Sequence, residues 1–315
     1  VINMINGEEP ISKEAVRGVL YSFFFSGLEN EKTLFFRLLL LVLLAAVLAG
    51  FVDVFENGQI GAVSFYVVYL VLFMMLMEAF GRLSSTLTVR LNWLGEFMKT
   101  LAPAYFLAVS TANGVSTAAV FYEGVLLLVW MIQWVLVNFL LPGVNLCILL
   151  KMVNYLSKEE MLSKMSELLE VVISWALKTL IGLAVGLQVV KNLVAPVMDS
   201  LKRTAVGKTA GAIPGIGNAV NAITQLILTS AVLVRNSFGA VILVLIAAAG
   251  LQPLIHYGAL SLSYRFLAAL AQPVSDKRIV GALSTMGEGC AWLLKLLLTA
   301  QILCMLAFLV LMAGG

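Results

Sequence analysis

Four polar side chains in the stretch from Gly207 to Asn236 have the spacing of one face of a helix. They recur at positions i, i+3, i+7 and i+11: Asn218, Asn221, Gln225 and Thr229. Side chains at these intervals lie on the same side of an α-helix. Their amides and hydroxyl would make a hydrated surface if that side met water, without any bond being made or broken. We therefore take these four residues as pore-lining candidates.

The same stretch has a second interpretation, as a seam where helices pack. Gly207, Gly211 and Gly215 follow one another at four-residue spacing, and small residues at that spacing let membrane helices approach closely. Pro214, Gly215 and Gly217 are also candidate helix breaks. Irregular backbone at membrane depth is tolerated where protein covers it or where it lines a water-filled cavity. Both interpretations stay open, and both can hold for different faces.

A second stretch of similar character covers residues 101–124. It is rich in small and hydroxyl residues, and we add its Ser110 and Asn113 to the pore-lining candidates. Proline removes a backbone N–H and clashes with the preceding helical turn. The remaining helix-break or hinge candidates are therefore prolines inside apolar runs: Pro103, Pro142 and Pro253.

Residues typical of catalysis or metal binding are few and scattered. The one histidine, His256, has no carboxylate near it in the sequence, and the three cysteines stand in apolar runs without metal-ligand spacing. The sequence contains no nucleophile elbow, zinc-protease motif or phosphate-binding loop. We predict that the protein is not an enzyme, and we expect no catalytic residue, cofactor or metal.

Two lysines stand deep inside apolar runs, Lys178 and Lys295. A charge at membrane depth is costly, so each is by default a functional hypothesis. Either the ammonium faces a pore or an ion-pair partner, or the side chain extends to the membrane surface along its apolar stem.

The elements that must position these residues are membrane-spanning helices. The chain is 61% hydrophobic and 12% charged, with a mean hydropathy of +1.02, whereas a soluble domain is about 45–50% apolar and about 25% charged. The apolar runs are continuous, unlike the alternating strands of a membrane barrel. The net charge of +3 gives no sign of nucleic-acid binding. We predict an all-α, polytopic helical protein in contact with membrane lipid.

The chain divides into an amphipathic N-terminal segment, residues 1–32, and a multi-span membrane domain, residues 33–315. The apolar patch of the first is too short to cross a bilayer, so we expect it to lie on a surface. Residues 151–170 are predicted to form an amphipathic helix at the interface. The run 238–271 is one kinked helix or two packed ones, and the final span is expected at about 292–312.

Within the membrane domain we predict two repeat-like units, at about residues 60–170 and 171–290. Pro103 and Pro214 are separated by about 111 residues, and so are Pro142 and Pro253. Internal repeats are common in transport proteins, where interrupted helices at corresponding positions point to the path.

Two basic segments, 81–99 and 191–208, are interpreted as loops. Lysine and arginine favour the cytoplasmic side, so both loops should face the cytoplasm. Two loops on one side require an even number of crossings between them. Each small-residue stretch is therefore predicted to be a re-entrant hairpin, and the two units would be parallel.

Short motifs in the C-terminal half resemble those of a known family. In order, they are Ile213-Pro214 with Gly217, then Arg235-Asn236, then Gln272-Pro273, then Asp276-Lys277-Arg278-Ile279 before a final apolar helix. This order is similar to that of the stage III sporulation protein AE family. The distinctive residues lie at about 205–290, and the resemblance in character covers nearly the whole chain.

The resemblance implies a multi-pass protein of endospore-forming bacteria, in the mother-cell membrane around the forespore. It implies a place in the multi-protein channel complex between the two cells, with the other stage III A sporulation proteins and the forespore protein Q. It also implies a cleaved signal peptide, which would put residue 1 outside the cytoplasm. The charge distribution puts residue 1 inside, so the two assignments differ by one crossing.

We expect a channel or conduit component, in which a ring-shaped homo-oligomer surrounds a polar path, since closed rotational symmetry is the usual way to build an axial pore. Two alternatives are kept. One is a secondary transporter with a site at the broken helices, and the other is a structural membrane anchor for the complex.

Overall fold

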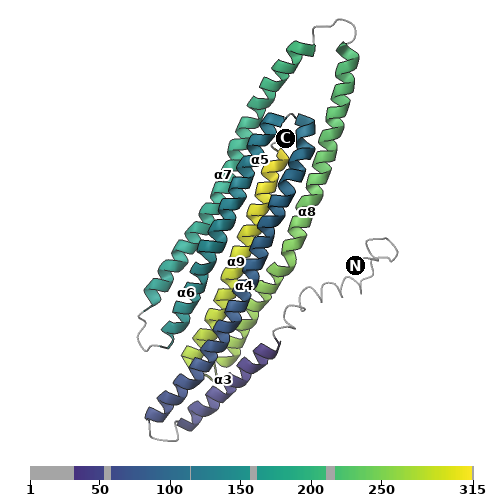
Figure 1. The fold of residues 1–315 in the computed structure, drawn as a ribbon. Helices are drawn as coiled ribbons and strands as arrows, with labels where there is room; N and C mark the ends of the chain where they lie inside the picture. Colours follow the sequence, from purple (N-terminus) through teal and green to yellow (C-terminus); the bar gives the residue numbers. More distant parts are fainter. Residues whose placement is uncertain (1–31, 53–57, 114, 157–161, 211–216, 314–315) are drawn as a thin grey trace, which may run out of the picture. The chain divides into compact units, whose positions relative to one another are not determined.

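Nearly all of the residues that the computed structural model describes are helical (Figure 1). The described residues are 32–52, 58–113, 115–156, 162–210 and 217–313, and they contain no strand. Within these ranges, side chains are described except at 45–46, 48–52, 58–62, 64–65, 104–122, 187, 190–236 and 313. The predicted all-α class is confirmed, while the N-terminal segment 1–32 lies outside the described residues except for Lys32.

Several of the helices are much longer than the hydrocarbon core of a bilayer is thick. They are α3 (Lys32–Val52), α4 (Gly58–Asn113), α5 (Val115–Val135), the π-helical turn η1 (Leu136–Leu140), α6 (Leu141–Asn154), α7 (Ser163–Ala210), α8 (Gly217–Ala271) and α9 (Lys277–Ala313). Helix α4 has 56 residues. At a rise of about 1.5 Å per residue its axis measures about 84 Å, whereas the hydrocarbon core of a bilayer is about 30 Å thick.

Five described helices are long and apolar enough to cross a membrane, which makes this a multi-pass membrane protein. The candidate spans are Tyr66–Pro103, Glu123–Asn154, Ser163–Gly186, Ser237–Ala271 and Lys277–Met312. The last begins well before the expected residue 292. Its first turns already bury Ile279, Leu283 and Met286 at helical spacing, so the apolar face of α9 extends through a segment that looks polar in sequence.

Two compact units make up the structure, and each is assembled from separated parts of the chain. Unit 1 contains Val1–Leu87, Leu141–Val172 and Leu251–Lys295. Unit 2 contains Thr88–Leu140, Ile173–Gly250 and Leu296–Gly315. These units do not follow the sequential division at about 60–170 and 171–290, and the repeat is not confirmed.

The two basic segments are helical, which corrects their interpretation as loops. Residues 81–99 lie inside α4, and residues 191–208 lie inside α7. In the first, Leu83, Leu87 and Leu91 are buried at four-residue spacing, and this apolar periodicity holds the segment in a helix despite its charges. The predicted parallel arrangement of the two units assumed two cytoplasmic loops, and that assumption no longer holds. The re-entrant hairpins stay predictions.

The structure also revises two smaller expectations. Residues 151–170 do not form one interfacial helix, because α6 ends at Asn154 and α7 begins at Ser163. The Asn154 Oδ1 atom accepts a hydrogen bond from the Leu162 backbone N–H at 3.1 Å, which satisfies a donor just before α7. The run 238–271 is one helix within α8, and Pro253 lies in its interior.

The chain stays helical on both sides of three prolines. Pro103 and Pro253 lie inside α4 and α8, whereas Pro142 follows directly on the π-helical turn η1 and the first residue of α6. A proline has no N–H for the carbonyl four residues earlier and crowds that carbonyl. A wider π turn at this point relieves the conflict without ending the helix. Whether these prolines act as hinges stays a prediction.

In unit 1, helix α9 is buried among its neighbours. Leu283, Met286, Cys290 and Leu293 are completely buried. Glycines let the other helices approach, since an added Cβ at Gly289 would lie 2.7 Å from the Phe80 ring and 3.2 Å from Ile148.

Hydroxyl groups add hydrogen bonds between the helices of unit 1. Ser261 Oγ donates to the Gly287 carbonyl of α9 at 2.7 Å, Tyr257 to the Leu83 carbonyl at 2.9 Å and Tyr69 to the Met152 carbonyl at 2.6 Å. Each bond joins two different helices, so α4 is tied to both α6 and α8 in this unit.

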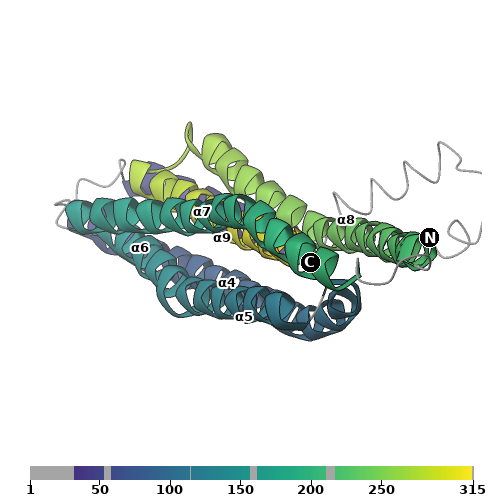
Figure 2. The same ribbon diagram turned by 90° about the horizontal axis from the view of Figure 1, so that it is seen from above.

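In unit 2, the second half of α4 and helix α5 run antiparallel and side by side (Figures 1 and 2). Gln133 of α5 packs against Gly95 of α4, and its Nε2 donates to Asn92 Oδ1 at 3.2 Å. A second glutamine is arranged in the same way. Gln301 of α9 fills the space beside Gly250 of α8 and donates to the Ile246 carbonyl.

The glycine contacts give a test with a matched control on two neighbouring helices. Gly289→Ala should be less stable than Gly258→Ala, because the new methyl group at 289 meets a ring at 2.7 Å whereas the one at 258 meets only Leu294 at 3.8 Å. Both variants gain the same helix propensity, so the difference isolates the clash, at about 1–3 kcal/mol. Thermal unfolding in lipid nanodiscs measures it. Equal midpoints would show that α9 is not closely packed at Gly289.

Candidate functional site

A network of charged side chains joins three helices in unit 1. The Nζ atom of Lys151 on α6 lies 2.7 Å from Glu170 Oε1 on α7 and 2.8 Å from Glu288 Oε2 on α9. The lysine side chain is 21% exposed, and the two carboxylates are 30% and 40% exposed. One ammonium thus bridges two carboxylates in a partly buried setting, where charge-assisted hydrogen bonds are strong.

Two further residues of α9 extend this network. The indole Nε1 of Trp292 donates to Glu170 Oε1 at 3.3 Å. The Nζ atom of Lys295 lies 4.1 Å from the centroid of the Trp292 ring, a position in which the ring face attracts a cation. Lys295, one of the two predicted intramembrane charges, is exposed. Its ammonium lies over an aromatic ring beside the network.

The charged network can hold helices together. Each carboxylate shares the same ammonium, so α7 and α9 are both fixed to α6. Among the described residues there is no group of three or more histidine, cysteine, aspartate or glutamate side chains that could hold a metal ion. The nearby thiol of Cys147 donates to the Ser166 carbonyl at 3.5 Å, which further joins α6 to α7.

Sequence reasoning missed this network because its members come from distant segments. The sequence pattern places Lys151 and Glu170 in one interfacial helix, and it places Glu288 before the final span. The lysine and Glu288 are separated by 137 residues in the chain. The only signal in the sequence was that each is a single charge beside a strongly apolar run.

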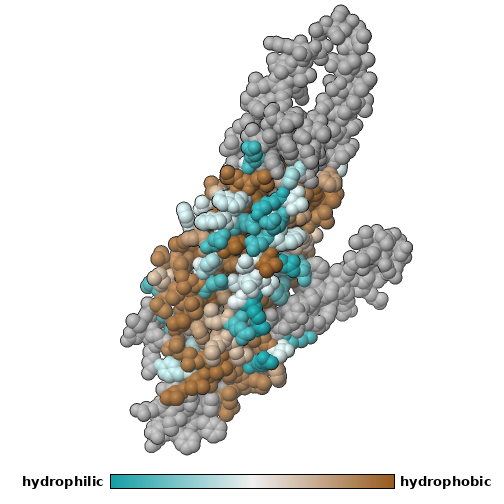
Figure 3. All heavy atoms as spheres, viewed as in Figure 1, coloured by the Kyte–Doolittle hydropathy of each residue, from teal (hydrophilic) through white to brown (hydrophobic). Residues whose placement is uncertain are grey.

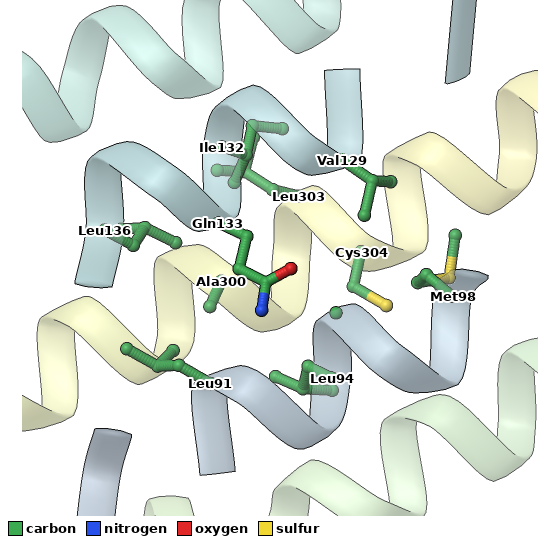
Figure 4. Close-up of a pocket in the computed structure, with 11 residues that line it drawn as sticks. Leu91, Leu94, Met98, Val129, Ile132, Gln133, Leu136, Ala300, Leu303 and Cys304 are labelled. Carbon is green, nitrogen blue, oxygen red and sulfur yellow. The ribbon is translucent and has the colours of Figure 1, made fainter. Parts of the chain in front are cut away.

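A small cavity lies in unit 2 between α4, α5 and α9 (Figure 4). Its volume is about 30 Å³, enough for about one or two water molecules. Most of the lining is apolar, with Gln133 and Cys304 as its polar members. Small-molecule sites measure about 300–1,000 Å³, so this cavity is suited to water and not to a substrate.

The predicted pore-lining residues all lie in helices. Asn218, Asn221, Gln225 and Thr229 are on the first turns of α8, in one continuous helix, so their positions share one face by register. Ser110 and Asn113 are three residues apart in the last turns of α4. Their side chains lie outside the described ones, so a lining role stays a prediction.

The remaining predicted residues are distributed over the helices. Lys178 is exposed on α7. Gly217 is the first residue of α8, whereas Pro214 and Gly215 lie outside the described residues.

The charged network gives a second test. Lys151→Met leaves Glu170 and Glu288 close together without their shared cation, and we expect a loss of about 1–3 kcal/mol in unfolding free energy. As a control, Lys164→Met removes an exposed i,i+3 pair with Glu167, in which the lysine is 87% exposed, and should cost less than about 1 kcal/mol. Unfolding in nanodiscs measures both.

The triple variant Lys151→Met, Glu170→Gln, Glu288→Gln separates charge balance from packing. It has no uncompensated charge, so most of the lost stability should return. If the triple variant is as unstable as the single one, the network does not act through its charges.

Comparison with known proteins identifies the family. The family described as stage III sporulation protein AE matches residues 1–315. A relative named stage III sporulation protein AE, from Bacillus subtilis (strain 168), is 21% identical over the whole of this chain and 79% of its own length. No solved structure matches the chain. Because the match extends from the first residue to the last, the chain belongs to the stage III sporulation protein AE family.

Proposed function

We propose that this protein is a membrane subunit of a conduit between mother cell and forespore, in which several copies surround a polar path. The family supports a role in sporulation, and the five candidate spans support a role within a membrane. Other stage III A sporulation proteins and the forespore protein Q are the proposed partners, and the mother-cell membrane around the forespore is the proposed location.

The continuity of α4 and α8 is the observation that carries this proposal. A secondary transporter usually binds its substrate where membrane helices are interrupted near the midplane. Here α4 runs through Pro103 and α8 runs through Pro253 without interruption. Long continuous helices are better suited to form the wall of a path between subunits.

The small cavity of unit 2 favours the same conclusion. Its volume of about 30 Å³ is about one tenth of the smallest typical ligand site. A path between copies needs no such cavity inside each one. The proposed lining includes the polar face of α8 at Asn218, Asn221, Gln225 and Thr229, together with Ser110 and Asn113 near the end of α4.

A flux assay tests the proposal. The chain is reconstituted with its proposed partners in liposomes loaded with carboxyfluorescein, and dye release is followed. The double variant Asn221→Leu, Gln225→Leu should reduce release, because two amides that would face water become apolar. Ile223→Leu, in the same turns of α8, is the control and should conduct like the parent protein.

Assembly is measured in parallel by co-purification of the partners and by the mass of the particle in detergent. A double variant that assembles but conducts poorly supports the conduit. A double variant that conducts normally contradicts a lining role for this face, and one that no longer assembles favours the structural anchor. If the parent protein assembles and releases no dye, the conduit itself is wrong.

A further inference from the structure

Helix α4 is buried along one side and exposed along the other in the part that lies in unit 2. Leu91, Leu94 and Met98 are buried. The exposed side carries the apolar residues Val89 and Trp93. It also carries four polar residues within an arc of about 100°, which we name the polar stripe: Asn92, Glu96, Lys99 and Thr100. In unit 1, the same helix exposes Glu78, Arg82, Ser85 and Thr86.

The neighbouring helix α5 presents the opposite character to its surroundings. The levels of the two helices can be matched, because Gln133 of α5 packs against Gly95 of α4 and donates to Asn92. In Figure 4, Met98 and Val129 lie toward one end of the cavity, and Leu91 and Leu136 lie toward the other. Around these levels α5 exposes Leu127, Trp130 and Trp134, each more than half exposed. Figure 3 shows hydrophilic residues over the part of α4 that lies in unit 2, with apolar residues beside them. Helix α5 therefore exposes apolar residues at the same levels at which α4 exposes charged ones.

Local pairing does not neutralise the polar stripe. Lys99 Nζ lies 2.9 Å from Glu96 Oε1, but the carboxylate is 68% exposed. Among the described residues, Thr100 donates to the Glu96 carbonyl of its own helix. Asn92 accepts a hydrogen bond from Gln133 of α5. Glu96, Lys99 and Thr100 are exposed, so the stripe retains charged and hydroxyl groups on the outer surface.

These groups lie in the last third of the candidate span Tyr66–Pro103. That span is longer than the hydrocarbon core is thick, so the apolar residues that α5 exposes at the same levels are what place the stripe at membrane depth. A charged side chain facing the hydrocarbon costs about 2.5–3.5 kcal/mol even on the more permissive scales. At that depth the polar stripe must face either water or another protein surface. Charged residues are depleted from the cores of protein interfaces, which favours water.

We infer that the polar stripe of α4 faces the water-filled path, with α5 turned toward lipid. This inference rests on the proposed function, and it names a surface that the sequence candidates did not include. The path is lined at this depth by ammonium, carboxylate, amide and hydroxyl groups. Small hydrated solutes are the class that such a surface admits.

Cysteine accessibility tests the inference with level-matched pairs. Thr100→Cys is compared with Leu127→Cys, and Glu96→Cys with Trp130→Cys, in the full chain reconstituted with its partners. The three native cysteines are buried and are kept in every variant, with the parent protein as the background control. The probe is a positively charged, membrane-impermeant methanethiosulfonate, which reacts only where water reaches the thiol.

We expect the two α4 cysteines to react at least about ten-fold faster than their α5 partners, because hydrocarbon excludes a charged reagent. Modification of Thr100→Cys should also reduce dye release, since the added group would occupy the path. Modification of Leu127→Cys should leave release unchanged.

Three results would overturn the inference. Equal reaction on α4 and α5 would place this depth outside the bilayer. No reaction on either helix would place the stripe against protein. Fast reaction on α4 without any effect on release would place the path elsewhere, while the proposed function stands. If the parent protein releases no dye, the proposed function fails, and the labelling pattern still decides whether the stripe meets water.

Discussion

A polar group at membrane depth must find a partner or water, and this constraint explains the hydrogen bonds and ion pairs between the helices. In unit 1, one ammonium of α6 satisfies carboxylates on α7 and α9. Hydroxyl groups of α4 and α8 donate to the carbonyls of neighbouring helices. In unit 2, the amides of Gln133 and Gln301 donate across helix pairs. Because lipid cannot compete for these bonds, they both position the helices and satisfy the groups.

Glycine makes several of these contacts possible. Gln133 and Gln301 each occupy the space that a side chain at Gly95 or Gly250 would fill. In unit 1 the Tyr155 ring rests in the same way against Gly281 of α9. The hydrophobic effect adds little between helices in lipid, so close packing and interhelical hydrogen bonds supply the association. The positions of the glycines therefore decide where the long side chains fit.

The proposed path follows from the same constraint, applied to the outer surface. The described interior is joined by hydrogen bonds and glycine contacts, and the small cavity of unit 2 accommodates water only. The exposed side of α4 differs, since it carries charges at the level of apolar residues exposed on α5. We propose an aqueous neighbour for this surface, in keeping with the proposed conduit. The charged network of unit 1 serves a different purpose, because its groups satisfy one another.

Composition and continuous apolar runs were enough to determine the helical membrane class, and the short motifs at about 205–290 were enough to indicate the family. The register of Asn218, Asn221, Gln225 and Thr229 also followed from the sequence, because helical spacing is a local property. The charges of segment 81–99 favour a loop, whereas the four-residue spacing of its leucines favours a helix. The structure shows that the spacing of the leucines is the better guide.

Only the tertiary structure decided which charges meet. Lys151, Glu170 and Glu288 stand on three helices, and no local pattern links them. Their contact depends on how α6, α7 and α9 pack. That packing in turn depends on glycines such as Gly289, next to Glu288, and on buried side chains distant in the chain, such as Phe80. The same holds for the polar stripe, since a charge in a helix can face a partner, lipid or water. The choice is made by the neighbouring helices, which cover one side of α4 and leave the other exposed.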